Sequence, residues 1–305
     1  MRYYIAVDIG GTAIKYGVLR EDGSLVLRRE TPTHAAARRG PGIVSCVERC
    51  ITELLQEYPA EGICISTAGM VNPERGEIFY SAPLIPDWAG TRLKAILETK
   101  FHLPCEVEND VNCAGLAESR SGAGKGKQFC LCLTVGTGIG GCLVMDGKVY
   151  HGAADSALEV GYLKLPGGDF QDLASTKSLV EKVERIQREK QLPSGNLNGK
   201  IIFDRAKDGD ETCIRAINEM TDTLGMGIAN LCYVLNPDAV ILGGGIMAQE
   251  AYLKPRIEAA LKRYLLPTVA ANTALLFAAY RNEAGMLGAF YHFIDKQKER
   301  TGRRV

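Results

Sequence analysis

The sequence predicts an α/β protein built from two related halves that meet near residue 117. Its 305 residues are enough for two domains of about 150 residues, each with its own core. A pattern of strand, glycine turn, strand, tight turn and strand occurs twice, over residues 3–26 and 129–150. Helical and strand patterns alternate after each copy, which is typical of α/β domains. We therefore predict domains over residues 1–117 and 118–282.

In the first half, the apolar strand Tyr3–Val7 leads into the glycine turn Asp8–Thr12. A second strand ends at Asp22-Gly23, a dipeptide typical of β-hairpins, and a short third strand follows. Apolar residues recur at helical spacing over Ile43–Glu57, which predicts a helix. The remaining expected elements of this half are a strand at Gly62–Ser66, a strand at Cys105–Glu108 and a helix at Val111–Ser119.

The second half repeats the meander, with the glycine turn Gly136–Gly141 and the hairpin turn Asp146-Gly147. Leu192–Gly199 is rich in Pro, Gly and Asn, which predicts a surface loop. The other expected elements are helices at about 175–190, 210–235, 249–264 and 283–299, and strands at Ala239–Leu242 and about 275–280.

Composition excludes several classes of protein. The 36 basic and 36 acidic residues cancel, which argues against a protein that binds nucleic acid through its net charge. No apolar stretch reaches the 20 or so residues that span a bilayer, so we expect a cytoplasmic protein without a membrane partner. The ten cysteines form no CxxC pair, which indicates small buried thiols rather than a metal site or disulfides.

The glycine turns allow several kinds of phosphate site. Gly136, Gly138 and Gly141 satisfy G-x-G-x-x-G, but a strand follows them, whereas a helix follows the turn of a Rossmann dinucleotide site. Gly122–Lys127 has the wrong spacing for a Walker A loop, and no HRD or DFG sequence indicates a protein kinase. The two turns are either plain hairpins or anion-binding nests of backbone N–H groups that hold one polyphosphate. In the second case Asp8 can orient the waters of a phosphate-bound Mg²⁺.

The motifs resemble those of a known family. Asp8-Ile9-Gly10-Gly11-Thr12 and Gly136-Thr137-Gly138-Ile139-Gly140-Gly141 look like the two phosphate motifs of the actin-like ATPase superfamily, and Gly243-Gly244-Gly245-Ile246 resembles its adenosine motif. Glu108-Asn109-Asp110-Val111-Asn112 and Glu159-Val160-Gly161-Tyr162 are similar to motifs of the ROK family of repressors and sugar kinases. The resemblance, over about residues 4–293, implies a two-domain actin-like ATPase (ribonuclease H-like) fold with an interdomain cleft. It also implies a small N-terminal domain, rejoined by the helix at about 283–305, and a larger C-terminal one.

The same resemblance implies an ATP- and Mg²⁺-dependent kinase of a hexose or hexosamine. Asp110 would be the catalytic base that accepts the proton of the sugar hydroxyl. Helix capping is the alternative role for an Asp at this position. The sugar would be bound by Gly69, Asn109, Asp110, Glu159, Tyr162 and Gln171. The nucleotide and its metal ion would be bound by Asp8, Gly10, Gly11, Thr12, Lys15, Gly136, Thr137, Gly138, Gly140, Gly244 and Gly245, with Asp8 reaching Mg²⁺ through water.

One segment departs from the family. Most members have His at the position of Tyr162 and cysteines after it, and these residues bind a structural zinc. Pro166–Leu173 contains no Cys, so a tetrahedral zinc site lacks ligands and we expect none. Apolar packing by Tyr162, Leu163, Leu165 and Phe170 is expected to hold the segment instead. Gln171 stands where the family has a second sugar-binding Glu, and whether Gln171 or Asp172 contacts the sugar stays open.

Among the classes of the family, the chain is most similar to zinc-free bacterial N-acetylmannosamine kinases, at Ser66–Val71, Pro83–Trp88 and Glu159–Tyr162. This predicts phosphorylation of N-acetylmannosamine at C6, with glucokinase and β-glucoside kinase as alternatives. Family repressors carry a helix-turn-helix domain before the first phosphate motif, which here begins at Asp8, so a sugar-sensing repressor is disfavoured. An inactive sugar-binding protein is disfavoured too, because Asp110 and both glycine turns are present. We expect a homodimer.

Overall fold

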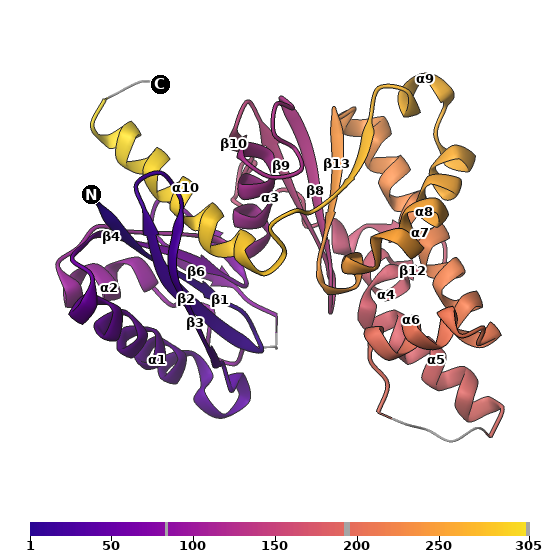
Figure 1. Ribbon diagram of the computed structural model, residues 1–305, viewed down its shortest axis with the longest axis horizontal. Coiled ribbons are helices and arrows are strands. Elements are labelled where there is room, and N and C mark those ends of the chain that lie inside the picture. The colour runs from indigo at the N-terminus through magenta and orange to yellow at the C-terminus, as the bar shows by residue number, and fades with distance from the viewer. Residues whose placement is uncertain (83–84, 192–195, 303–305) are drawn as a thin grey trace. The chain divides into compact units, whose positions relative to one another are not determined.

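The computed structural model describes residues 1–82, 85–191 and 196–302 and is an α/β structure (Figure 1). The chain divides into two compact units. The first contains Met1–Arg120, Lys148–Ala157 and the segment from Asn282 on, and the second contains Ser121–Gly147 and Leu158–Arg281. Pro83, Leu84 and the first four residues of the predicted loop Leu192–Gly199 lie outside the described residues.

Two five-stranded sheets share one topology. The first has the order β3 (Leu25–Pro32), β2 (Ala13–Arg20), β1 (Tyr3–Ile9), β4 (Ala60–Thr67) and β7 (Cys105–Asn109). The second has the order β10 (Lys148–Val149), β9 (Ile139–Met145), β8 (Phe129–Val135), β13 (Ala239–Gly243) and β14 (Ala274–Phe277). In the first sheet, β1 is antiparallel to β2 and parallel to β4. In the second sheet, β8 is likewise antiparallel to β9 and parallel to β13. The predicted repeat of the meander is thereby confirmed.

In the first unit, helices lie on both faces of the sheet. These are α1 (Ala35–Glu57), α2 (Leu93–Phe101), α3 (Asp110–Arg120) and α10 (Ala284–Arg300), and the unit also holds the hairpin β5 (Met70–Asn72) and β6 (Glu77–Tyr80). Side chains of a strand alternate between faces, so Ile5, Val7 and Ile9 of β1 enter a core shared with α1. The intervening Tyr4 contacts the rings of Phe290 and Phe293 on α10.

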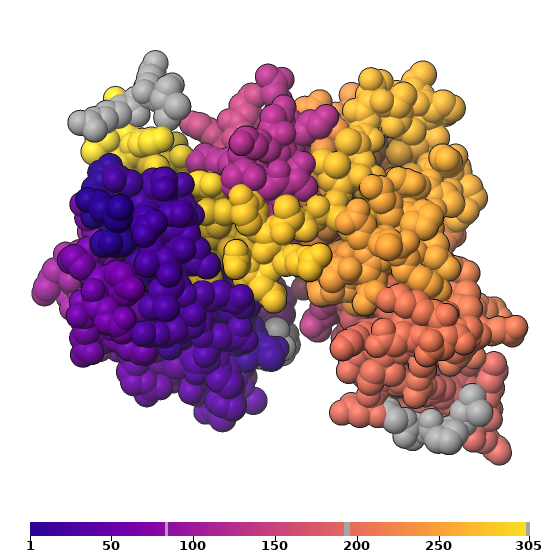
Figure 2. All heavy atoms as spheres, in the orientation of Figure 1, coloured from indigo at the N-terminus to yellow at the C-terminus, as the bar shows by residue number. Residues whose placement is uncertain are grey.

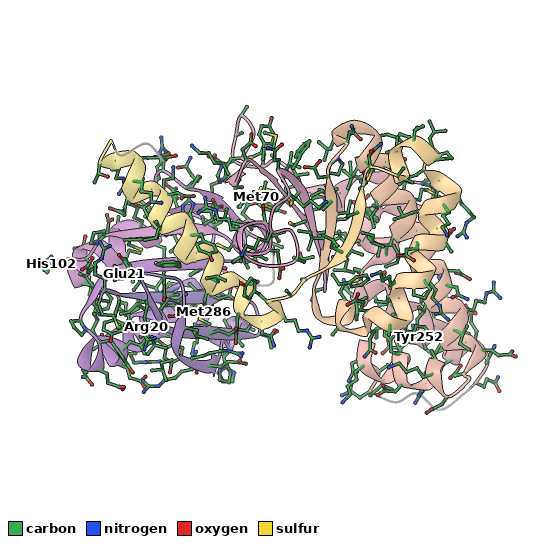
Figure 3. All side chains as sticks on the ribbon, turned by 45° about the horizontal axis from the view of Figure 1, so that its top comes forward. Arg20, Glu21, Met70, His102, Tyr252 and Met286 are labelled. Carbon is green, nitrogen blue, oxygen red and sulfur yellow. The ribbon has the colours of Figure 1, made fainter. Side chains whose placement is uncertain are left out.

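The helix α10 packs tightly on this sheet. A Cβ atom added at Gly62 of β4 would lie 2.1 Å from the ring of Phe293, so only glycine leaves room for that ring. In the space-filling view, yellow atoms of α10 adjoin the indigo atoms of the first strands (Figure 2). Met286 on the same helix, labelled in Figure 3, is 1% exposed. The end of the chain therefore completes the core begun by its first strand.

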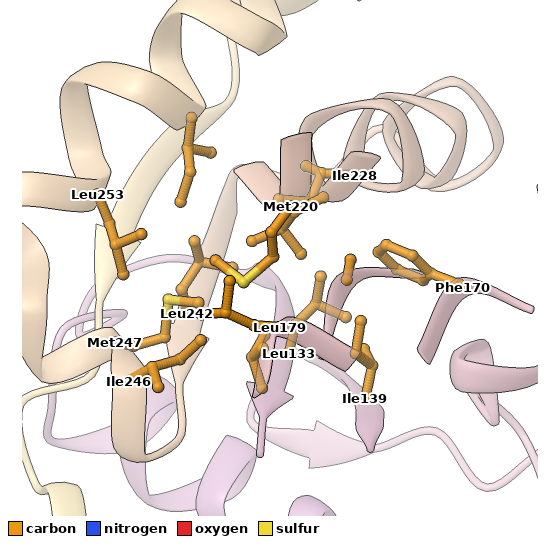
Figure 4. Close-up of a cluster of buried hydrophobic side chains, with 14 of the residues drawn as sticks. Leu133, Ile139, Phe170, Leu179, Met220, Ile228, Leu242, Ile246, Met247 and Leu253 are labelled. Carbon is orange, nitrogen blue, oxygen red and sulfur yellow. The ribbon is translucent and has the colours of Figure 1, made fainter. Parts of the chain in front are cut away.

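The second unit has a larger set of helices, which are α4 (Phe170–Ala174), α5 (Thr176–Glu189), α6 (Gly199–Lys207), α7 (Glu211–Leu235), α8 (Glu250–Tyr264) and α9 (Pro267–Ala270). Shorter elements are β11 (Lys164–Leu165), β12 (Gly168–Asp169) and the 3₁₀ turns η1 (Val160–Tyr162), η2 (Gly245–Gln249) and η3 (Arg281–Glu283). Its core joins Leu133 and Leu242 of the strands to Met220 and Ile228 of α7 and Leu253 of α8 (Figure 4).

Two sequence-based interpretations concern the whole chain. All ten cysteines are buried and none is in a disulfide, which confirms the interpretation of buried thiols. Within the described ranges, no helix is both long enough and apolar enough to cross a membrane.

Candidate functional site

In the first unit, the strand register places two side chains on Asp8. Lys15 lies opposite it on β2 and Ser66 lies opposite it on β4. The Ser66 hydroxyl donates to Asp8 Oδ1 at 2.7 Å, and Lys15 Nζ lies 3.4 Å from Oδ2. The Asp8 carboxylate also fills the space beside Gly285, at the N-terminus of α10, where the helix dipole favours a negative charge.

The glycine turn after β1 is closed by its own hydrogen bonds. The Gly10 N–H donates to the Ala13 carbonyl at 3.0 Å, and the Thr33 hydroxyl donates to the Gly10 carbonyl at 2.6 Å. The Thr33 N–H donates to the Thr12 carbonyl at 2.8 Å. The carbonyl groups of Gly10 and Thr12 are thus bonded within the first unit, while Gly11 is partly exposed and Thr12 is exposed.

The junction of β7 and α3 brings together three of the predicted sugar-binding residues. Asn109 Nδ2 donates to the Gly69 carbonyl at 2.9 Å and to Asp110 Oδ1 at 3.0 Å. Asn109 Oδ1 accepts from the Val111 and Asn112 N–H groups at 2.8 and 3.0 Å, so the Asn109 side chain caps α3. Asp110 Oδ1 accepts from the Val111 N–H at 3.0 Å as well. The side chains of Asn109 and Asp110 therefore both accept from N–H groups of the first turn of α3.

Trp88 supports the turn that carries Gly69. Its ring is fully buried, and its Nε1–H donates to the Thr67 hydroxyl and to the Ala68 carbonyl, both at 3.1 Å. Gly69 has a φ of 106°, and a Cβ there would lie 2.8 Å from the Tyr80 carbonyl oxygen, so the turn requires glycine.

The second glycine turn borders a cavity of about 670 Å³ in the second unit. Of the predicted nucleotide residues, Gly136, Thr137 and Gly245 line it. The Thr176 N–H at the start of α5 donates to the Gly136 carbonyl at 2.8 Å. Gly140 instead pairs with Thr134 inside the sheet, and Gly244 packs on the Val135 backbone. Gly138 faces the carboxamide of Gln171.

The cavity wall also contains residues that the motifs did not indicate. Leu197 and Phe203 form apolar parts of the wall beside Ile246 of the motif Gly243–Ile246, and Asn198, Lys200 and Glu181 add polar groups. The ring of Phe203 meets that of Tyr252, labelled in Figure 3, edge to face at 5.7 Å. The buried Thr176 hydroxyl has no hydrogen-bond partner in the described structure. The sequence gives little signal for this wall, because its residues come from three separate segments.

Glu159, Tyr162 and Gln171 lie around the short turn η1. Burial raises the pKa of Glu159. Tyr162 and Leu163 are 43% and 38% exposed, so the prediction that their apolar packing helps to hold the segment is wrong, whereas Leu165 and Phe170 are buried as expected. The Gln171 carboxamide oxygen lies 2.6 and 2.9 Å from where a Cβ of Gly138 and of Gly161 would be, and Asp172 is exposed.

The Asp8 carboxylate suits one kind of metal ion. Mg²⁺ usually keeps several waters and takes one or two carboxylates together with substrate phosphates. Asp8 offers one carboxylate, 14% exposed and held by Ser66. Among the described residues, no three His, Cys, Asp or Glu side chains are grouped to hold a metal ion. These donors fit a cation that arrives with a nucleotide.

Comparisons with known proteins agree on the family. The family model described as "ROK family" matches residues 4–296. A Clostridium perfringens protein of uncharacterized function is 46% identical over 96% of this chain and 98% of its own length. The β-glucoside kinase of Klebsiella pneumoniae is 33% identical over 94% of this chain and 95% of its own.

Solved structures agree on the fold. A ROK family glucokinase from Streptomyces griseus, in complex with glucose and AMPPNP, has a TM-score of 0.83 and 28% identity, over 94% of this chain and 97% of its own. A candidate N-acetylmannosamine kinase from Listeria monocytogenes has a TM-score of 0.85 and 29% identity, over 97% and 99% of the two chains. The predicted actin-like ATPase fold is thereby confirmed, and the chain belongs to the ROK family.

Proposed function

We propose that this protein is an ATP- and Mg²⁺-dependent kinase that phosphorylates a hydroxyl group of a hexose or hexosamine. The observation that carries the proposal is the Asp110 carboxylate at the strand-to-helix junction, beside the Asn109 amide that the Gly69 carbonyl holds. A sugar hydroxyl attacks the γ-phosphoryl group only as its proton leaves, and a positioned carboxylate can accept that proton. In this role Asp110 is the base, and Asn109 and Gly69 bind neighbouring sugar hydroxyls.

The cavity beside the second glycine turn suits the nucleotide. Its apolar wall can accept a purine, and polar groups at its rim can bind ribose hydroxyls. The start of the fourteen-residue helix α5 adjoins Gly136, and a helix N-terminus favours the negative charge of a phosphate. Asp8 would orient waters of the Mg²⁺ ion that comes with the triphosphate and neutralises charge on the transferred group.

We infer that N-acetylmannosamine is the substrate and C6 the site of transfer. The likeness to the Listeria monocytogenes structure supports this choice, while the Klebsiella pneumoniae and Streptomyces griseus relatives support a β-glucoside or glucose. These sugars differ in substituents at C1 and C2. A site rejects an analogue strongly where it would leave a buried polar group unpaired. We also propose that the protein is cytoplasmic and forms a homodimer. Light scattering during gel filtration tests the dimer, because it measures the molar mass in solution.

A coupled assay of ATP consumption tests the function. Glucose, mannose, N-acetylmannosamine, N-acetylglucosamine and a β-glucoside are compared at saturating Mg²⁺. We expect turnover with at least one of them, and a product phosphorylated at C6. No turnover above the sugar-free blank for every sugar would refute the kinase assignment.

The variant Asp110→Asn tests the base. Asn keeps an oxygen that can accept from Val111 and Asn109, so the junction stays folded, but it cannot take a proton. We expect kcat to fall by at least about 10²-fold with a similar sugar Kd. A variant with near-normal kcat would show that Asp110 is not the base.

A further inference from the structure

A buried carboxylate lies directly behind the junction that carries Asp110. Glu108 of β7 is 0% exposed. Its Oε1 accepts from the Asn109 N–H at 2.8 Å and from Asn112 Nδ2 at 3.0 Å. Its Oε2 lies 2.6 Å from His151 Nε2 and 3.5 Å from His292 Nδ1. One oxygen therefore holds the backbone beside Asp110, and the other is held by imidazoles.

His151 comes from a different part of the chain than the junction it supports. It lies in the segment 148–157 of the first unit, whose Asp155 accepts from Asn72 Nδ2 at the end of β5 at 2.7 Å. The His151 carbonyl accepts from the Ala157 N–H at 3.1 Å, which closes the loop on itself. The backbone carbonyl and the Nε2 atom of His151 are thus both bonded, and the side chain is 24% exposed.

The electrostatics of the cluster favour an ionised carboxylate. Burial alone would raise the pKa of Glu108, but the hydrogen bond from His151 and the nearby imidazoles outweigh it, and the pKa falls to about 2. Burial lowers the pKa of His151, yet the bond to Glu108 and its charge raise it overall. Burial lowers the pKa of His292.

Other titratable groups face Glu108 and His151 from each element around them. Lys296 and Asp295 lie on α10, and Asp155 lies on the segment of His151 itself. The Cys113 thiol of α3 is close as well, and burial raises its pKa well above the usual range. Of the surrounding groups, His151 makes the shortest contact with Glu108, at 2.6 Å.

We propose that His151 is a positioning residue, which keeps Glu108 bound and charged so that Glu108 fixes the Asn109 backbone and, through it, the direction of the Asp110 carboxylate. Without this donor, burial would dominate and Glu108 would bind a proton at mildly acidic pH. A protonated carboxyl is a weaker acceptor for the Asn109 N–H, so the junction would loosen. The catalytic part of this inference rests on the proposed function, but the structural part does not.

The structural part is tested by NMR of the full chain, which contains four histidines, so their imidazole signals can be assigned by single substitutions. We expect the His151 imidazole to titrate above pH 6.5 in the wild type and to lose this elevation in Glu108→Gln. In His151→Leu, the Asn109 amide signal should titrate at least one pH unit higher than in the wild type. Unchanged titrations of both signals would overturn the proposal.

The catalytic part is tested by the pH profile of kcat/KM for the sugar. We expect His151→Leu to lose at least about tenfold at pH 5.5, to lose less at pH 7.5, and to shift its acid limb upward by about one pH unit or more. His151→Gln keeps a donor and should recover most of the loss. His102→Asn, at an exposed histidine with a φ of 54°, is the matched control and should match the wild type.

The outcomes separate this inference from the proposed function. A uniform loss in His151→Leu, with an unshifted acid limb and no rescue by Gln, would indicate a merely structural residue and overturn the positioning role. A wild type that phosphorylates no sugar would refute the kinase, while the NMR titrations still decide whether His151 controls Glu108. Thermal unfolding of each variant confirms that the protein compared is folded.

Discussion

Trp88→Phe should weaken sugar binding through the turn that carries Gly69. The substitution removes the indole N–H that donates to Thr67 and Ala68 at 3.1 Å each. A lost buried hydrogen bond costs about 1 kcal/mol, and the smaller ring leaves a gap in a site that is 0% exposed. We estimate a total of about 2–3 kcal/mol, which lowers Tm by about 4–12 °C for a unit of this size.

The effect on sugar affinity follows from the same geometry. Thr67 and Ala68 lead directly into Gly69, whose carbonyl holds the Asn109 amide. If about half of this lost free energy destabilises the turn at Gly69, the sugar Kd rises about tenfold, since 1.4 kcal/mol is a factor of ten. Phe293→Leu is the control, because this buried ring packs over Gly62 and away from the sugar turn. It should lower Tm with a normal Kd.

The wild-type chain offers a direct assay, because Trp88 is its single tryptophan. Sugar should change the tryptophan emission in proportion to binding, and calorimetry gives the Kd of the variant that lacks the indole. Equal sugar affinities in the wild type and Trp88→Phe would refute the reasoning. So would an emission that stays constant while calorimetry reports saturation.

Three further predictions concern other parts of the chain. Gly199→Val should raise the KM for ATP at least about tenfold with an unchanged sugar Kd, because its Cβ would lie 2.8 Å from Ile246 in the proposed nucleotide cavity. A normal KM would contradict the proposal that the nucleotide binds there. Lys94→Met removes the 2.6 Å partner of the buried Glu106, which keeps Arg300 at 2.7 Å on its other oxygen, and should cost about 1–3 kcal/mol near neutral pH. Burial already raises the pKa of Glu106, and a raised pKa means stability that is lost as pH rises, so the Tm deficit should be larger at pH 8 than at pH 5. Chelation followed by return of Mg²⁺ should leave activity unchanged, and one zinc per chain by elemental analysis would contradict the expected lack of a zinc site.

The sheets were predictable because their strands are buried and end at recognisable turns. The strand expected at Gly62–Ser66 is observed as Ala60–Thr67, and the helix expected at Val111–Ser119 begins one residue earlier. The helices α2 and α6 were not predicted, since each has nine residues, fewer than the ten to twelve or so at which a periodic pattern separates a helix from a strand. Element boundaries in loops depend on tertiary packing, which a local pattern does not contain.

The proximity of the candidate site residues follows from the topology. Parallel strands end at one edge of a sheet, so Thr67 at the end of β4 lies opposite Asn109 at the end of β7. Their motifs could therefore be placed together from the sequence. The pairing of Glu108 with His151 could not, because 43 residues separate them and the His151 loop has no periodic pattern.

In the segment after Glu159, the apolar residues alone did not predict which side chains are buried. Four apolar residues were expected to hold it, but the three-residue turn η1 leaves Tyr162 and Leu163 at the surface. Leu165 and Phe170 are buried as expected, and Phe170 lies in a space that exists only because position 227 on α7 is glycine, where a Cβ would lie 2.3 Å from the ring. Phe170 is apolar, but the sequence around it does not indicate that the glycine at position 227 makes room for its ring. The burial of Phe170 therefore depends on α7, a helix more than fifty residues further along the chain.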